Sequence, residues 1–323
     1  MDNVKVLEKI NNQKNQFYSE ISKIIVGQAE VIEHIFIALL CKGHILLEGV
    51  PGLGKTLIIK TISEILELNF NRIQFTPDLM PSDITGTEII SQNANSGDRE
   101  LKFIKGPIFS NIILADEINR TPPKTQSALL EAMQENRVTT GGTTYDIGEP
   151  FLVLATQNPI EQEGTYPLPE AQLDRFMFNV LIDYPSIEEE QSIVKFNTSK
   201  TNNKLNVIIK KDDLLDFQNL IINIPISDNV ITYAVNFVHS TRPSSNSPDI
   251  TNKYIQWGAG PRASSYLILA AKAKAILNGK ATPDIDDVKS VMKSVLRHRI
   301  NMNFNAEAEG IKIDSLLNQL MDQ

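Results

Sequence analysis

The stretch Gly49-Val-Pro-Gly-Leu-Gly-Lys-Thr56, "GVPGLGKT", lies between a short apolar run and a segment with helical apolar spacing. It matches G-x-x-x-x-G-K-[ST] in the context that this pattern requires, a strand before it and a helix after it. Gly52 and Gly54 let backbone amides approach phosphate oxygens, and the N-terminus of the helix adds its dipole to the anion site. Lys55 would neutralise the β- and γ-phosphates, and the Thr56 hydroxyl would ligate Mg²⁺. The stretch therefore predicts a nucleotide-binding loop.

Strands and helices alternate around this loop. Downstream of it, Ile58, Ile62, Ile65 and Leu66 follow i, i+4, i+7, i+8 spacing and form one apolar stripe. Alternation of this kind indicates an α/β domain with a mainly parallel, three-layer sheet. Apolar runs bounded by turn residues predict its buried strands, at 44–48, 72–75, 112–116, 151–156 and 178–183.

The strand pattern fades after Tyr184-Pro185, and the rest of the chain is predicted to be helical. In "TPDIDDVKSVM", Thr282 is the expected cap, with Pro283 at the first helical position. The predicted organisation is an α/β core at 1–184 with an N-terminal helix at 1–22, a linker at 185–210 that starts with a helix, and a small all-α domain at 211–323. The helices of that domain are expected at 211–222, 227–240, 263–278 and 284–298.

Charge and composition exclude several classes of protein. The 323 residues carry 31 basic and 39 acidic side chains, net -8, without a Lys/Arg-rich block, which disfavours a general electrostatic grip on nucleic acid. The N-terminus is too polar for a signal peptide, and the longest apolar run, "IFIALLC", is too short to span a bilayer. The single cysteine, Cys41, cannot form an intrachain disulfide. We therefore expect a cytoplasmic protein without a membrane span.

An apolar strand in "NIILADEINR" delivers Asp116 and Glu117 side by side at its carboxyl end. Asp116 would hold Mg²⁺, and Glu117 would act as the general base that polarises an attacking water. An Asp before "EINR" could alternatively be a helix N-cap. The neighbouring phosphate-binding loop favours the metal and base roles.

A further apolar strand, "FLVLATQNP", ends with Gln157 and Asn158. An amide at this position could hydrogen-bond both the γ-phosphate and the attacking water, and so orient that water for Glu117. Asn-Pro is also an ordinary turn sequence, so this pattern alone decides little.

Together, these three segments resemble the AAA+ ATPases of the MoxR family. The resemblance covers the chain from about Ile24 to about Arg299, and the ordered set of motifs is specific because unrelated P-loop proteins share only the first one. The matching stretches are "IVGQ" (25–28), "GHILLEGVPGLGKT" (43–56), "RIQFTPDLMPSDITG" (72–86), "KGPIF" (105–109), "ILADEINRTPPKTQSALLEAMQE" (113–135), "EGTYPLPEAQLDRF" (163–176) and "GAGPRA" (258–263).

The resemblance implies ATP and Mg²⁺ as cofactors and a role for each matching residue. Asn158 matches sensor 1, and Arg175 in "LDRF" matches the arginine finger, which in such families reaches the nucleotide of the neighbouring subunit. Arg262 in "GPRA" matches sensor 2 on the helical lid. The Walker A loop, the Walker B pair and the segment along the adenine are matched by Gly49, Gly52, Leu53, Gly54, Lys55, Thr56 and Leu57, by Asp116 and Glu117, and by Val26, Gly27 and Gln28.

Both arginines also have structural interpretations. Charge on a transferring γ-phosphoryl group must be met by more than one cation, and an arginine finger contributes about 10³ to 10⁵ in rate. Arg175 could instead form a salt bridge with the adjacent Asp174 or another carboxylate, and the residues alone leave both readings open. Arg262 could be a surface cation near the start of a lid helix. Its charge would oppose the helix dipole there, which favours an anionic partner.

Two segments resemble the family's insertions, at 87–106 in helix 2 and at 137–148 before sensor 1. The second reads as a hairpin about Gly141-Gly142. In related motors such loops face the pore of the ring and touch the client. Without the resemblance, two plain surface hairpins would be the preferred interpretation.

The function implied by the resemblance is an ATP-hydrolysing motor, assembled as a ring, most often a hexamer. Its expected work is chaperone-like: it would remodel or mature client protein complexes, including metal-cofactor insertion, often with a partner that carries a von Willebrand A domain. The alternatives are the ATPase subunit of a metal chelatase, a nucleic-acid-stimulated motor, and a nucleotide-gated scaffold that rarely turns over. The wording "TPDLMPSDITG" and "LLEAMQE" favours MoxR over the chelatase.

Three single residues receive structural interpretations. Trp257 is expected to pack between linker and lid. His298 in "LRHRI" is expected to lie in a solvated basic helix end. His44, three residues after Cys41, has no second pair of ligands nearby, so no zinc site is expected.

Overall fold

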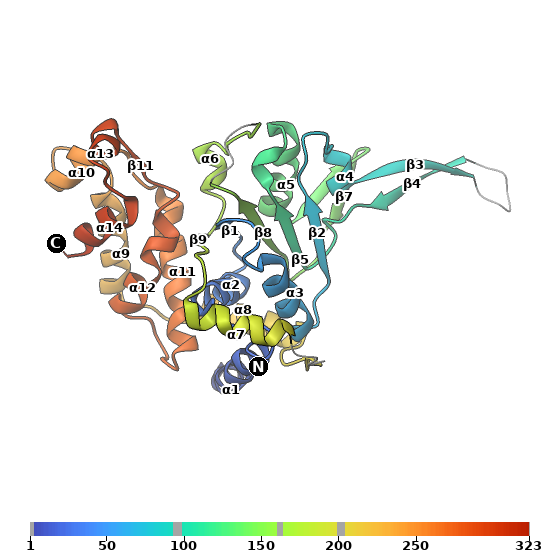
Figure 1. The fold of residues 1–323 in the computed structure, drawn as a ribbon, viewed down its shortest axis with the longest axis horizontal. Helices are drawn as coiled ribbons and strands as arrows, with labels where there is room; N and C mark the ends of the chain where they lie inside the picture. Colours follow the sequence, from blue (N-terminus) through green and yellow to red (C-terminus); the bar gives the residue numbers. More distant parts are fainter. Residues whose placement is uncertain (1–2, 93–98, 160–163, 199–203, 323) are drawn as a thin grey trace.

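The computed structural model describes residues 3–92, 99–159, 164–198 and 204–322. It confirms an α/β core followed by a helical domain. Figure 1 shows the core in the centre, the orange and red helical domain at one end, and a two-stranded hairpin that extends away from the opposite end. The tip of the first predicted insertion (93–98), residue 163 of a matching stretch and residues 199–203 of the predicted linker lie outside the described residues.

The core contains a five-stranded parallel sheet with the strand order β2-β5-β8-β1-β9. Central strands are buried along almost their whole length because helices cover both faces. The edge strand β2 is mostly exposed, and only its residue Ile73 is buried. All five predicted strands are present: β1 (Ile45–Glu48), β2 (Phe70–Gln74), β5 (Ile112–Asp116), β8 (Leu152–Gln157) and β9 (Phe178–Leu181).

Helices enclose this sheet, and the predicted N-terminal helix is α1 (Asn3–Ile21). The predicted apolar stripe belongs to α3 (Lys55–Ile65) and its C-cap, Leu66, and it is buried. The other core helices are α2 (Ala29–Leu40), α4 (Pro81–Thr85), the 3₁₀ turn η1 (Ile118–Arg120), α5 (Pro123–Glu135) and α6 (Glu170–Leu173). The predicted linker opens with α7 (Ile187–Thr198), which lies across the front of the core below α3 in Figure 1.

Both predicted insertions form antiparallel hairpins, β3 (Gly86–Gln92) with β4 (Arg99–Lys105), and β6 (Arg137–Thr140) with β7 (Thr143–Asp146). The β3–β4 hairpin extends from the body of the molecule (Figure 1). The two hairpins touch, because the ring of Phe103 stacks on that of Tyr145 with centroids 4.2 Å apart. Aromatic stacking therefore joins insertions that are far apart in the sequence.

The helical domain contains the four predicted helices, and helix α12 starts later than predicted. Asp284, not Thr282, is its N-cap. The Asp284 carboxylate accepts a hydrogen bond from the Asp287 amide (3.1 Å), and the Asp287 carboxylate accepts one from the Asp284 amide (3.0 Å). The predicted helices are α8 (Lys211–Asn223), α9 (Asp228–Ser240), α11 (Pro261–Leu277) and α12 (Ile285–Leu296). The domain also contains α10 (Asp249–Tyr254), α13 (Phe304–Ala308), α14 (Ile313–Met321) and the two-stranded sheet of β10 (Ile255–Trp257) and β11 (Asn301–Met302).

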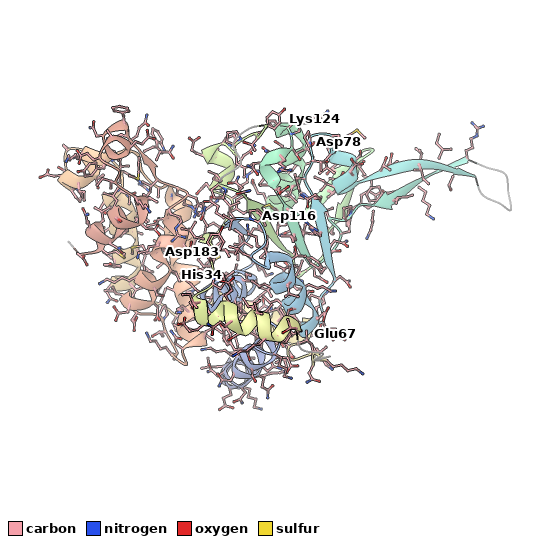
Figure 2. All side chains as sticks on the ribbon, viewed as in Figure 1. His34, Glu67, Asp78, Asp116, Lys124 and Asp183 are labelled. Carbon is pink, nitrogen blue, oxygen red and sulfur yellow. The ribbon has the colours of Figure 1, made fainter. Side chains whose placement is uncertain are left out.

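The helical domain packs against the core through continuous apolar contacts. Helix α8 lies against α1 and α2. His34 of α2 hydrogen-bonds Ser294 of α12 at 2.8 Å, and Figure 2 places His34 where the blue core helices meet the orange ones. In the described part of the chain, no helix has both the length and the apolar character needed to cross a membrane.

Two of the single-residue expectations are wrong. Trp257 is 72% exposed, because a register shift between Ile255 and Trp257 breaks the alternation of β10 and turns the indole outward. The basic end at 297–299 is not solvated either. Arg299 is buried, and His298 donates a hydrogen bond to the carbonyl of Phe176 (3.0 Å). Core residues cover this turn, which local sequence does not reveal.

A buried histidine fixes the start of β1. The Val153 amide donates to Nδ1 of His44 (3.0 Å), so the proton is on Nε2, which donates to the Met133 carbonyl (3.0 Å). Both ring nitrogens are thus occupied by backbone groups, as expected for a residue that does not bind zinc. Burial lowers the pKa of His44 to about 4.

This lowered pKa predicts a loss of stability in mild acid. The unfolded chain binds a proton near pH 6.5 and the folded one near 4, so the contribution of His44 is complete above about pH 6.5 and declines as the pH falls towards 4. At pH 5.5 the free energy of unfolding should be lower by about 1 kcal/mol from this residue. In His44→Asn, the amide oxygen can still accept from the Val153 amide, but the side chain does not titrate. Between pH 7.5 and 5.5, we expect the free energy of unfolding, measured in urea, to fall less in this variant than in wild type.

The exposed His239 provides a control for the substitution itself, because His239→Asn makes the same replacement on the surface of α9 and should leave the free energy of unfolding at pH 7.5 near that of wild type. An equally steep decline in His44→Asn and in wild type would contradict the assignment.

Candidate functional site

The glycine-rich loop joins the end of β1 to the start of α3. Gly52 and Gly54 have φ of +89° and +75°, left-handed values that favour glycine, and Gly54 caps the helix. At Gly49, a Cβ would lie 2.5 Å from the carbonyl oxygen of Ile182. Glycine is therefore required at these turns, and the first amides of α3 are left without intrahelical partners. The loop has the construction of an anion site.

Lys55 is held over this loop. Its ammonium group donates to the Gly49 carbonyl at 2.5 Å. Partial burial lowers the pKa of Lys55, while Asp116, Glu117 and Glu48 act in the opposite direction. A partly desolvated cation beside unpaired amides is well suited to phosphate oxygens.

The predicted carboxylates stand at the same edge of the sheet as the loop. Ala115 of β5 pairs with Ala155 of β8, and Glu48 of β1 pairs with Gln157, so the carboxyl ends of the three strands lie together. Asp116 ends β5 (Figure 2). On β8, the Thr156 hydroxyl donates to Asp116 Oδ1 (2.6 Å).

Glu117 adopts a left-handed backbone conformation, φ 58° and ψ 50°. This conformation is uncommon outside glycine and costs free energy, so it persists only where neighbours enforce it. Here the Glu117 amide donates to the Thr156 hydroxyl at 2.8 Å. The turn takes Glu117 out of strand alternation, which would otherwise direct neighbouring carboxylates to opposite faces. Two adjacent carboxylates can therefore serve one site.

Two polar residues that sequence analysis missed connect these carboxylates on their exposed side. Arg72 Nη2 donates to Asp116 Oδ2 (2.6 Å) and to Gln74 Oε1 (2.7 Å), and Gln74 Nε2 donates to Glu117 Oε2 (2.8 Å). Both lie on the edge strand β2. The pattern that could have revealed them is the pair of polar residues two apart in "RIQF", whose side chains share one face of a strand.

Asn158 directly follows β8 and is 9% exposed. The structure thus brings together the loop, Lys55, Asp116, Glu117 and Asn158 at one edge of the sheet. The metal ligands inferred from sequence, Thr56 and Asp116, offer a hydroxyl and a carboxylate, oxygen donors that suit Mg²⁺. In the described residues, no group of three or more His, Cys, Asp or Glu forms a metal cage. One protein carboxylate with substrate phosphates is the usual arrangement for Mg²⁺.

A cavity of about 440 Å³ adjoins the loop, a size suited to a small-molecule ligand. Gly27 stands against α7, and a Cβ there would collide with the Glu189 carboxylate. Of the predicted binding residues, the cavity is lined by Val26, Gln28, Gly52, Leu53, Gly54 and Leu57. Sequence analysis missed Ile24, Ile25, Pro51, Ile58, Tyr184, Pro185, Glu190, Ile193 and Phe196. The four residues from 184 to 193 and Phe196 were assigned to the core boundary and the linker. The apolar residues of "SIEEEQSIVKF" predict a helix with one apolar face, but not what that face covers.

The structure places the two predicted arginines outside this cavity. Arg175 lines a separate polar groove with residues of α5 and of the β6–β7 hairpin. Its guanidinium forms no ion pair with any residue that the structure describes. Asp174, its sequence neighbour, is instead paired with Arg262 (3.0 Å) and Arg299 (2.8 Å). The alternative reading of Arg175, a salt bridge with Asp174, is therefore wrong, and the Arg262 guanidinium is paired with a carboxylate of its own chain.

Comparison with known proteins decides the family. The model of the ATPase family associated with various cellular activities (AAA) matches residues 44–178, and that of the AAA lid domain matches residues 248–320. Chaperone MoxR1 of Mycobacterium tuberculosis is 44% identical over 94% of this chain and 79% of its own length. The chain belongs to the MoxR family of AAA+ ATPases.

More distant relatives and solved structures agree with this membership. Protein MoxR of Methylorubrum extorquens is 27% identical over 88% of this chain and 86% of its own. A crystal structure from Cytophaga hutchinsonii superposes with a TM-score of 0.91 at 44% identity, covering 98% of this chain and 96% of that one. As a MoxR-family ATPase, the protein has an AAA core and a helical lid. Family membership supports nucleotide binding and ATPase activity.

Lys55 gives a direct test of the phosphate site. Lys55→Ala should weaken ATP binding at least ten-fold, because it removes the ammonium that stands over the loop. Lys60→Ala, on an exposed turn of the same helix, should bind as wild type does. Titration of a fluorescent ATP analogue measures both. Equal affinities of the two variants would show that phosphates do not bind at this loop.

Proposed function

We propose that this MoxR-family protein hydrolyses ATP with Mg²⁺ and uses the energy to remodel client protein complexes. The observation that supports hydrolysis best is the carboxylate pair beside the phosphate loop, with Thr156 bound to both members. Only one carboxylate is needed to hold a metal ion. A second one held in a strained backbone conformation at the same edge has the placement of a general base.

Each residue then has one part in the reaction. The loop amides and Lys55 bind the β- and γ-phosphates, and Thr56 and Asp116 hold Mg²⁺, which neutralises charge that develops on the phosphoryl group. Glu117 takes a proton from the attacking water, and Asn158 orients that water. The cavity residues Val26, Gln28, Tyr184 and Phe196 receive the adenine, whose apolar faces suit this largely apolar lining. Gly27 lies between two of them, against the Glu189 carboxylate of α7.

Arg175 acts on the nucleotide of a neighbouring subunit. Its guanidinium has no carboxylate partner in the described structure and lies outside the cavity of its own chain. A ring, expected to be a hexamer, would present this free cation to the next site. Arg262 of the lid would then move from Asp174 to the nucleotide of its own site, because a triphosphate carries more negative charge than one carboxylate.

The two hairpins are the proposed client contacts. Ile90 and Leu101 are cross-strand partners on the projecting β3–β4 hairpin and are 69% and 71% exposed. An exposed apolar pair on a projecting element suits a protein client. The name of the relative Chaperone MoxR1 supports such work over the chelatase alternative. We keep the cytoplasm as the proposed compartment and a protein with a von Willebrand A domain as a proposed partner. Metal-cofactor insertion is one proposed task.

Glu117→Gln tests the base. The amide keeps the size and the hydrogen-bonding ability of the side chain but cannot accept a proton, so ATP should bind as in wild type while hydrolysis falls at least 100-fold. Nucleotide titration and steady-state phosphate release measure the two effects. Glu8→Gln, on an exposed turn of α1, should hydrolyse ATP normally. Undiminished turnover in Glu117→Gln would remove the residue from the mechanism.

A mixture of two inactive variants tests the action of Arg175 between subunits. Arg175→Ala subunits keep a complete site of their own, and Lys55→Ala subunits keep the arginine, so mixed rings contain some complete sites. Activity should reappear on mixing, and the specific rate of wild type should rise with protein concentration as rings assemble. A mixture as inactive as its parents would place the role of Arg175 within its own chain.

A further inference from the structure

The segment between α6 and β9, Asp174 to Met177, carries Arg175 and is held by side chains of the lid. Four consecutive carbonyls of this segment accept hydrogen bonds from the lid. Arg299 donates to Asp174 O (2.9 Å), Phe176 O (2.5 Å) and Met177 O (3.3 Å). Tyr266 donates to Arg175 O (3.3 Å). The backbone on both sides of Arg175 is therefore fixed by a different domain of the same chain.

Arg299 is the centre of this arrangement. Its side chain is 1% exposed and forms an ion pair with Asp174 at 2.8 Å. Its guanidinium also lies 5.2 Å from the centroid of the Tyr266 ring. A buried cation is costly unless its donors are satisfied, and here the planar fork of arginine meets one carboxylate and several carbonyls at once. Lysine has three donors on one nitrogen and cannot reproduce this geometry.

Attachment of the lid to the core does not by itself explain the hydrogen bonds of Arg299. Arg297, two residues earlier, also ties the lid to the core, because it donates to the Asn179 carbonyl of β9 (3.2 Å) while it pairs with Asp314 of the lid (2.8 Å). In the described structure, it donates no hydrogen bond to the segment 174–177. Arg299 instead addresses the backbone around Arg175, whose guanidinium has no partner in the described residues. An arginine that must extend across an interface needs its backbone fixed, because a guanidinium that reaches the phosphates in a poor orientation accelerates the reaction much less.

We propose that Arg299, assisted by Tyr266, is a positioning residue for Arg175. If Arg175 acts between subunits as proposed above, the lid of each subunit fixes the arginine that completes the site of the next one. Asp174 strengthens the connection, because it binds Arg299 and also Arg262, the residue proposed to respond to the nucleotide of the same chain.

Arg299→Lys tests the proposal in the full-length protein. The variant keeps the charge opposite Asp174 but loses the fork that holds the carbonyls. ATP binding to its own site should equal that of wild type, and the ATPase rate should fall at least ten-fold. Arg297→Lys is the control, since it makes the same substitution at a neighbouring lid arginine that is also largely buried (13% side-chain exposure against 1% for Arg299), and it should keep the wild-type rate.

Two readouts separate positioning from simple structural damage. Arg299→Lys should be no slower in an Arg175→Ala background than Arg175→Ala alone, because the two residues act through one group. Mixed with Lys55→Ala subunits, Arg299→Lys should regain activity as Arg175→Ala does, and mixed with Arg175→Ala subunits it should not. A further loss in the double variant, or recovery with Arg175→Ala, would overturn the proposal.

The outcomes also distinguish this inference from the proposed function. If Arg175→Ala and Lys55→Ala fail to complement, action between subunits is wrong, and the double variant alone still decides whether Arg299 acts through Arg175. If Arg299→Lys does not fold, Tyr266→Phe replaces it, because it removes only the hydroxyl that binds the Arg175 carbonyl. We expect a two- to five-fold slower rate from Tyr266→Phe, absent in the Arg175→Ala background. An equal loss in both backgrounds would contradict positioning.

Discussion

The hydroxyl of Thr156 connects the two carboxylates to which we assign the metal and base roles. It has one proton, given to Asp116, and a lone pair that accepts from the Glu117 amide. These bonds fix Asp116 at the end of its strand and hold Glu117 in a left-handed turn immediately after it. They exist only because β8 lies between β1 and β5, which brings Thr156 next to Asp116 and Gln157 next to Glu48. Strand order thus determines the local geometry of the site.

Patterns within one element predicted much of the fold. The loop and its helix, the five strands and the four principal lid helices followed from apolar spacing and turn residues, and the structure confirms them. Strand order did not follow, because it depends on contacts between distant segments. Thr156 therefore looked like one more strand residue. The hydrogen bonds of Arg72 and Gln74 to the carboxylates were missed for the same reason, because they depend on the position of β2 beside β5 at the edge of the sheet.

The errors have a common physical source as well. Trp257 was expected to pack between linker and lid, but a register shift in β10 exposes it. His298 was expected to be solvated because of its charged neighbours, but the core segment at 174–177 covers it. Helix α7 was treated as a connection, although it closes the cavity beside the phosphate loop. In each case, a tertiary contact overrode a correct local tendency.

In the proposed ring, the position of Asp174 would connect nucleotide binding in one site to hydrolysis in the next. One carboxylate accepts from Arg262 through Oδ2 and from Arg299 through Oδ1, so neither arginine blocks the other. If Arg262 moved to a nucleotide, Asp174 would keep Arg299 as its one cation partner in the part of the chain that the structure describes. The segment that carries Arg175 would then be bound more exclusively to the lid. A lid displaced by its own nucleotide would therefore move the segment that carries Arg175. In a ring of such subunits, nucleotide binding in one site would then change the position of the arginine at the next site, through the hydrogen bonds between lid and segment alone.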